Sequence, residues 1–110
     1  MQVTPTHLHS MIIQPEGTLN ADNMVELQHQ LFSALHSESH SSLIIDLKQV
    51  ELIDSAALMM LAAAHHGARQ RNKRVVLCSI PRSVQMIFEL TQLDQVFEIL
   101  EMATPFDLAA

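Results

Sequence analysis

The sequence predicts an α/β fold, and three observations support this prediction. Segments with strand character alternate with segments of helical character along the chain, which is the pattern of an α/β layer architecture. Two short runs, LIIDL at 43–47 and VVLC at 75–78, are almost continuously apolar, as expected of strands buried on both faces of a parallel sheet. A helix-forming segment lies between them, so the three segments together predict one right-handed βαβ unit.

A strand and a helix are expected before the first apolar run. Residues 7–13 alternate loosely between polar and apolar side chains, which indicates an edge strand or one arm of a hairpin. Gly17 marks a turn, and Asn20 then provides a good helix N-cap, with Asp22 in the first turn, where negative charge suits the helix dipole. Apolar residues follow at helical spacing and predict a helix to about residue 36: Met24, Leu27, Leu31 and Leu35.

The crossover helix and two further elements are expected after the first apolar run. The apolar pair Leu52 and Ile53 sits in a short connector, and residues 54–70 are rich in alanine, leucine and methionine, which are strong helix formers. Pro81 opens another helix, because proline at the first helical position loses no intrahelical hydrogen bond. The segment VFEIL at 96–100 predicts a last short strand, and residues 102–109 predict a terminal helical turn.

Composition indicates the size of the domain, the cellular compartment and whether the chain inserts into a membrane. A chain of 110 residues with 48% hydrophobic residues suits one compact domain with its own core. The single cysteine, Cys78, excludes an internal disulfide, fits a reducing compartment and is interpreted as a small core residue. We find no signal peptide pattern and no apolar run approaching about 18 residues. The sequence therefore predicts a cytoplasmic protein that does not insert into a membrane.

Charge argues against nucleic acid as a partner. The net charge is −6 with histidines neutral, whereas nucleic-acid binders display a basic stripe that neutralises phosphates. The one basic cluster lies within residues 69–74. We interpret it as a solvated helix end whose cations favour the C-terminal end of the dipole, and the alternative is a patch for a phosphate or a partner.

Metal binding and catalysis are not predicted. His7 and His9 could share one strand face, and His36 and His40 have i,i+4 spacing, but no cysteine or carboxylate cluster completes a zinc shell. We therefore expect surface histidines, no metal and no other cofactor. Ser55 lacks a nucleophile elbow, and no glycine-rich phosphate loop occurs, so the chain is not expected to be an enzyme.

The step Asp54-Ser55 opens the crossover helix and has two interpretations. As an N-cap, either residue would satisfy a backbone N–H group that lacks an intrahelical partner. Alternatively, a phosphate attached to Ser55 would meet unpaired N–H groups and the positive end of the helix dipole. This end of an open α/β sheet is also where ligands and partners dock.

Three segments, in the correct order, resemble the STAS domain family. EGTLNADNMVELQHQL at 16–31 is similar to the family's Gly-x-Leu-Asp turn and first helix. ELIDSAALMML at 51–61 resembles the motif usually written Asp-Ser-Ser-Gly-Leu-Gly-x-Leu. NKRVVLCSIPRSVQMIFELTQLDQVFEI at 72–99 resembles the closing strand and helix and the Leu-Thr-Gly-Leu step. The resemblance implies one STAS domain over residues 1–110, an α/β fold with a STAS-like mixed sheet of four to five strands and about four helices mainly on one side.

The resemblance also implies a function of the anti-sigma-factor-antagonist type. In such family members the serine directly after the aspartate is the regulatory phosphorylation site, and by position this residue is Ser55. The unmodified domain would bind an anti-sigma factor that is also a serine kinase, and so release a sigma factor in a partner-switching cascade. Phosphorylation would end that binding, and a serine phosphatase would restore it. The implied partner-binding residues are Asn20, Asp22, Asn23, Asp54, Ser55, Ala56, Ala57 and Met59.

Three departures from the family pattern bear on the partner. Ala57 and Met59 stand where the motif usually has glycine, and Asn20 stands where the first turn usually has aspartate. These changes affect partner identity and kinase recognition more than the fold. Two alternative functions are a STAS subunit of a membrane transport assembly, in which the domain carries no phosphate, and a nucleotide-sensing STAS module.

Overall fold

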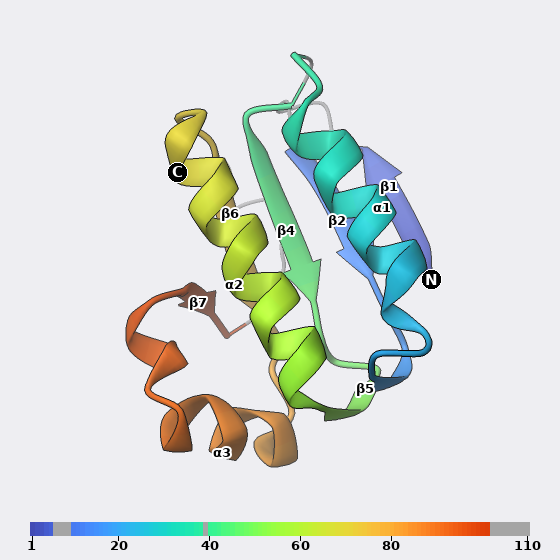
Figure 1. Cartoon of the computed structure of the whole chain (residues 1–110), viewed down its shortest axis with the longest axis vertical. Helices are drawn as coiled ribbons and strands as arrows, with labels where there is room; N and C mark the ends of the chain where they lie inside the picture. Colours follow the sequence, from blue (N-terminus) through green and yellow to red (C-terminus); the bar gives the residue numbers. More distant parts are fainter. Residues whose placement is uncertain (6–9, 39, 102–110) are drawn as a thin grey trace.

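A five-stranded sheet forms the centre of the protein in the computed structural model, which describes residues 1–5, 10–38 and 40–101 (Figure 1). The strand order is β1-β2-β4-β6-β7. Strand β1 runs antiparallel to β2, and the pairs from β2 to β7 are all parallel. The strands of this main sheet are β1 (Gln2–Pro5), β2 (Ser10–Gln14), β4 (Ser42–Asp46), β6 (Arg74–Cys78) and β7 (Glu98–Leu100).

A second, smaller sheet consists of two short parallel strands. These are β3 (Gly17–Leu19) and β5 (Val50–Ile53). Gly17 has a φ of 77°, a left-handed conformation that glycine adopts without a steric penalty. The small sheet connects β2 to the first helix and β4 to the second, so it lies where both helices begin.

Helices α1 (Met24–Leu35) and α2 (Ser55–Gln70) lie side by side across one face of the main sheet (Figure 1). Each buries an apolar stripe that repeats every three or four residues, as an amphipathic helix does. Helix α3 (Arg82–Leu90) and the short 3-10 helix η1 (Leu93–Gln95) follow β6 and lead into β7. The buried residues of α1 and α2 are Leu27, Leu31, Ala34, Leu35, Ala57, Leu58, Met60, Leu61, Ala64 and Ala68.

The two apolar runs form β4 and β6, which are neighbouring parallel strands inside the sheet, as predicted. The crossover between them contains α2. Leu43 and Ile45 belong to the main core, whereas Ile44 joins a separate buried cluster with Val76 and Cys78. Because alternate side chains of a strand point to opposite faces, burial on both faces explains why these strands are apolar throughout. The prediction that Cys78 is a core residue is also confirmed.

The predicted mixed sheet of four to five strands is present as the main sheet, but the second sheet and the number of helices were not predicted correctly. The described residues contain seven strands in two sheets, and three α-helices instead of about four. The apolar pair Leu52 and Ile53 belongs to strand β5, not to a connector. Only Val50 and Ile53 of this strand are buried, so it lacks the simple alternation that identifies a half-buried strand. Strand β1 was missed because it is a short edge strand that ends in proline.

Two further predictions concern the chain ends. The predicted hairpin arm at 7–13 is confirmed in part, since β2 begins at Ser10 and pairs with β1 as a hairpin. Residues 6–9 lie outside the described part of the chain. The helical turn predicted at 102–109 also lies outside it.

Candidate functional site

The start of α2 places a capped aspartate beside an exposed serine. Asp54 is the N-cap residue, and its Oδ1 accepts a hydrogen bond from the Ala57 N–H group at 2.9 Å. Ser55 is the first helical residue, and its side chain is exposed. Of the two capping alternatives, the structure therefore assigns the cap to Asp54. The Ser55 hydroxyl forms no hydrogen bond with any other described residue, so it is not needed to hold the helix start.

The same aspartate connects α2 to the turn that precedes α1. Its Oδ2 accepts a hydrogen bond from the Ala21 N–H group at 3.2 Å, and its own N–H group donates to the Leu19 carbonyl at 3.0 Å. One carboxylate thus binds two backbone segments that lie far apart in the sequence. This arrangement brings the predicted turn next to Ser55.

The turn at 20–23 is organised by two asparagine side chains. Asn20 Oδ1 accepts hydrogen bonds from the N–H groups of Asp22 at 2.9 Å and Asn23 at 3.1 Å. Asn23 Oδ1 in return accepts a hydrogen bond from the Asn20 N–H group at 2.9 Å. Such local bonds between asparagine side chains and nearby backbone are typical of turns. The turn is therefore held by three internal side-chain hydrogen bonds, although Ala21, Asp22 and Asn23 are all exposed.

The prediction that Asn20 is the N-cap of α1 was wrong. The helix begins at Met24, and the N-cap is Asn23, whose side chain makes no capping hydrogen bond with the helix. Asn20 caps the preceding turn instead, and its carbonyl accepts from the Met24 N–H group at 3.0 Å. The predicted N-cap lies three residues before the observed one. An asparagine side chain bonds equally well to a turn and to a helix start, so its residue type alone does not separate the two.

Two exposed apolar residues, Leu52 and Met59, lie close to Ser55 along the chain. Met59 is 73% exposed and lies one helical turn after Ser55, on the same face of α2. Leu52 of β5 is 55% exposed and lies three residues before Ser55. Ala56 is half-buried, whereas Ala57 is fully buried and packs in the core. The methyl group of Ala57 thus lies beneath this surface, although the sequence placed the residue among the partner-binding candidates.

Sequence reasoning missed Leu52 and Ala21 as members of this site. An apolar residue within an apolar pair is normally assigned to the core, so nothing local identified Leu52 as exposed. Ala21 contributes only its backbone N–H group to the site. Almost every residue type has this group, so the sequence did not single out Ala21.

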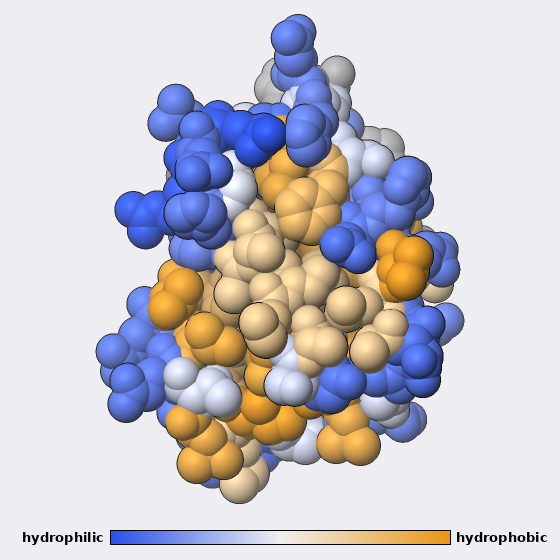
Figure 2. All heavy atoms as spheres, viewed as in Figure 1, coloured by the Kyte–Doolittle hydropathy of each residue, from blue (hydrophilic) through white to orange (hydrophobic). Residues whose placement is uncertain are grey.

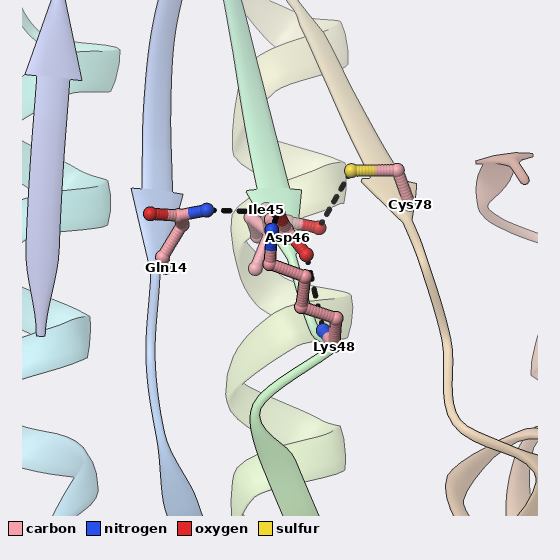
Figure 3. A network of polar contacts seen from close by, with 5 residues as sticks. All are labelled: Gln14, Ile45, Asp46, Lys48 and Cys78. Atoms are coloured by element: carbon pink, nitrogen blue, oxygen red, sulfur yellow. Dashed lines mark hydrogen bonds and ion pairs between the residues drawn. The ribbon is translucent and has the colours of Figure 1, made fainter. Parts of the chain in front are cut away.

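A buried polar network supports the loop that leads from β4 to β5 (Figure 3). Asp46 is 3% exposed, and its carboxylate accepts hydrogen bonds from Gln14 Nε2 at 2.9 Å and from the Lys48 N–H group at 3.0 Å. The Lys48 ammonium lies 3.8 Å from the same carboxylate. A buried carboxylate is stable only when it is paired in this way. The network therefore holds the loop after β4 in place, and this loop leads to β5 and then to Ser55.

The described residues contain neither a metal-binding cluster nor a helix that could span a membrane. Among the residues that the structure describes, no group of three or more histidine, cysteine, aspartate or glutamate side chains could hold a metal ion. His36 Nδ1 donates a hydrogen bond to the Phe32 carbonyl at 2.7 Å, and its Nε2 accepts one from Arg71 at 3.0 Å. His7 and His9 lie outside the described residues. No described helix is both long enough and apolar enough to cross a membrane.

Comparison with known proteins identifies the family. The sequence model of the STAS domain matches residues 1–105. BtrV of Bordetella bronchiseptica, a protein named as an anti-sigma factor antagonist, is 25% identical over 100 residues, which cover 90% of this chain and 85% of BtrV.

Two solved structures have the same fold. A protein from Thermotoga maritima that is named as an anti-sigma factor antagonist has a TM-score of 0.83 at 22% identity, covering 92% of this chain and 86% of that chain. The phosphorylated form of the Bacillus cell fate determinant SpoIIAA has a TM-score of 0.76 at 13% identity, covering 98% and 95%. The family match, the relative and the shared fold lead to one conclusion: this chain belongs to the STAS domain family.

Proposed function

We propose that this STAS domain is a regulatory protein of the anti-sigma-factor-antagonist type, whose binding to a partner is controlled by phosphorylation of Ser55. The observation that carries the proposal is an exposed serine at the first helical position, beside an aspartate that already caps the helix. The names of BtrV and of the Thermotoga protein support the class of function. The partner would be an anti-sigma factor that is also a serine kinase, a phosphatase would reverse the reaction, and the cascade would operate in the cytoplasm.

The docking surface of the unmodified domain combines polar and apolar groups. We define it as Asn20, Asp22, Asn23, Leu52, Asp54, Ser55, Ala56 and Met59. Met59 stands where the family usually has glycine and adds exposed apolar area, so the partner must offer a complementary apolar pocket. Ala57 occupies the other usual glycine position, but its methyl group points into the core and does not obstruct approach.

The helix start explains how a phosphate would be held. The first N–H groups of a helix have no intrahelical partner, and Asp54 accepts only that of Ala57. The N–H groups of Ser55 and Ala56 remain for a phosphate, at the positive end of the dipole. No large conformational change is required for the modified state.

Loss of binding would follow from charge. A phosphate adds about −1.5 to −2 charges beside Asp54, in a chain whose net charge is already −6. A partner that buries the helix start would have to desolvate this dianion, whereas it previously covered only a small hydroxyl. A domain that acts as a structural subunit of a transport assembly would not depend on this charge.

The test uses the candidate kinase with ATP and maps phosphate on the protein by mass spectrometry. We expect one modified site at Ser55 and none in Ser55→Ala. Ser55→Asp should weaken partner binding at least about tenfold, since an added charge at a buried contact is poorly tolerated. Ser33→Asp adds the same charge to an exposed position on α1 and should leave binding unchanged.

Two results would contradict the proposal. If phosphate were found on another residue and none on Ser55, phosphorylation at the start of α2 would not control partner binding. Equal binding by Ser55→Asp and the unaltered chain would show that the docking surface does not include Ser55.

A further inference from the structure

A basic cleft lies at the opposite end of α2 from Ser55. Its volume is about 480 Å³, and its lining includes His65, Arg69, Asn72, Lys73, Arg74 and Glu98. Four of the six lysine and arginine residues of the chain fall within 69–74. Figure 2 shows hydrophilic side chains gathered around this end of α2, whereas alanine-rich and apolar surface covers its middle. On α2 the lining residues His65 and Arg69 lie 10 and 14 residues after Ser55, which places them roughly 15 and 21 Å from it along the helix axis.

Most of the positive charge around this cleft is not neutralised. The Lys73 ammonium donates to the carbonyls of Ala34, at 3.4 Å, and Ser37. Arg71, next to the cleft, donates to the Gly67 carbonyl and to His36. These acceptors carry no negative charge. Within the described ranges, Arg74 is the one cation of this cluster that pairs with a carboxylate.

The ion pair of Arg74 with Glu98 can be exchanged for another anion. Both side chains are exposed, at 57% and 43%, and ion pairs that stand in water contribute little to stability. The Arg74 guanidinium donates two hydrogen bonds to the Glu98 carboxylate, a geometry that also suits a phosphate. Glu98 therefore occupies the position that an external anion would take.

Two further groups in the cleft have no hydrogen-bond or ion-pair partner among the residues that the structure describes. Arg69 is exposed and forms no ion pair with a described residue. His65 Nδ1 is buried without a hydrogen bond among the described residues, and its ring contacts Phe97 edge-on at a centroid distance of 5.3 Å. A buried polar nitrogen without a partner is unfavourable, but solvent does not reach this atom, so Arg69 is the one of these two groups that an incoming ligand can contact.

We propose that the basic cleft binds a ligand that carries phosphate groups, at a site separate from the docking surface. A guanidinium group recognises phosphate oxygens in a bidentate manner, and the ammonium of a lysine adds a point charge; the lining of the cleft supplies both types of group. The volume of the cleft lies within the range of small-molecule sites, roughly 300–1,000 Å³. The proposal does not depend on Ser55, so its failure would leave the proposed function intact.

Calorimetric titration at fixed ionic strength, with inorganic pyrophosphate, ADP and adenosine as probes, tests the proposal. We expect saturable binding of pyrophosphate and ADP with one site per chain. Tighter binding of ADP would show that the base and sugar also contact the cleft, and equal binding would identify the phosphates as the whole ligand. Adenosine that binds as tightly as ADP would overturn the proposal.

Variants locate the site. Arg69→Gln and Arg74→Gln should each weaken pyrophosphate binding about tenfold, the effect of one charge-assisted hydrogen bond. Glu98→Gln should strengthen binding, because it removes the carboxylate that competes for Arg74. Arg82→Gln changes the net charge equally at an exposed position on α3 and should leave the affinity within about twofold.

Thermal unfolding of each variant would confirm that it is folded before binding is compared. The proposal is overturned if pyrophosphate shows no saturable binding to the unaltered protein. It is equally overturned if Arg82→Gln weakens binding as much as Arg69→Gln, because net charge alone would then explain the effect.

Discussion

Both ends of α2 are attached to α1, but by side chains of opposite charge. At the N-terminal end, the Asp54 carboxylate accepts N–H groups from α2 and from the turn before α1. At the C-terminal end, Lys73 donates to carbonyls at the end of α1. The signs follow the helix dipole, which favours anions at the first turn and cations at the last.

The two attachments differ in rigidity. Asp54 has a short side chain, is half-buried and makes two hydrogen bonds to backbone N–H groups. Lys73 and Arg71 reach α1 through long side chains, which lose more rotamer freedom when they are held. The N-terminal end of α2 is therefore fixed well enough to display Ser55 in one geometry, whereas the C-terminal end carries positive charge that is open to an external anion.

Asp54→Ala should have the largest effect on stability. The change removes the N-cap and the hydrogen bond to Ala21 and leaves two N–H groups without their acceptor. We expect a loss of about 2 kcal/mol in the free energy of unfolding, measured by urea denaturation. Asp54→Asn keeps an acceptor oxygen and should lose less. Equal, small losses in both variants would show that the carboxylate does not hold the two segments together.

Lys73→Met should have a smaller effect. Methionine retains the apolar stem of lysine but cannot donate to the carbonyls of Ala34 and Ser37. We expect a loss of about 1 kcal/mol in the same urea experiment. Arg82→Met removes an exposed cation from α3 and serves as the control, with a change within about 0.5 kcal/mol. If Lys73→Met were as stable as Arg82→Met, the hydrogen bonds from Lys73 to the carbonyls of Ala34 and Ser37 would not contribute to stability.

The parts of the fold that sequence predicted are those set by local pattern. β4 and β6 were recognisable because burial on both faces makes a strand apolar at every position. The start of α2 was recognisable within one residue because an Asp-Ser step precedes a long run of helix-forming residues. In both cases the physical cause acts on neighbouring residues, so the sequence displays it directly.

The parts that sequence missed depend on contacts between distant segments. Strand β5 exists because β3 pairs with it, and neither strand is long enough to show a periodic pattern. The basic cleft requires β7 to bring Glu98 beside Arg74, 24 residues away. Similarly, Leu52 is exposed only because of how β5 is oriented. Pairing and orientation are tertiary properties, and residue type alone does not encode them.

The pH dependence of stability should reveal the environment of His65. The pKa of this imidazole lies below its ordinary value of 6.5, first because of burial and then because of Arg69 and His66, while Glu98 opposes the shift. The unfolded chain then binds a proton at a higher pH than the folded protein does, so stability falls as the pH drops below 6.5 through the lowered pKa. The ring is only half-buried, so we expect a smaller effect than that of Lys73→Met.

Urea unfolding at about pH 7.5 and about pH 5.5 measures this effect in the range where histidine titrates. His65→Gln should lose part of the pH dependence, and His29→Gln, at an exposed position on α1, should retain it. Identical pH dependence in His65→Gln and in the unaltered protein would show that the C-terminal end of α2 does not disfavour the charged imidazole.

Ser55→Ala should have the smallest effect on stability, and this result separates the two roles of the helix start. Asp54, not Ser55, provides the cap, and alanine is well tolerated at the first helical position, so the free energy of unfolding should change by less than about 0.5 kcal/mol. The same variant should still bind the partner, because it removes only a hydroxyl from the docking surface. A loss near that of Asp54→Ala would instead make Ser55 a structural residue. A change near zero, together with loss of binding in Ser55→Asp, would show that one residue holds the helix start while its neighbour remains free to carry the signal.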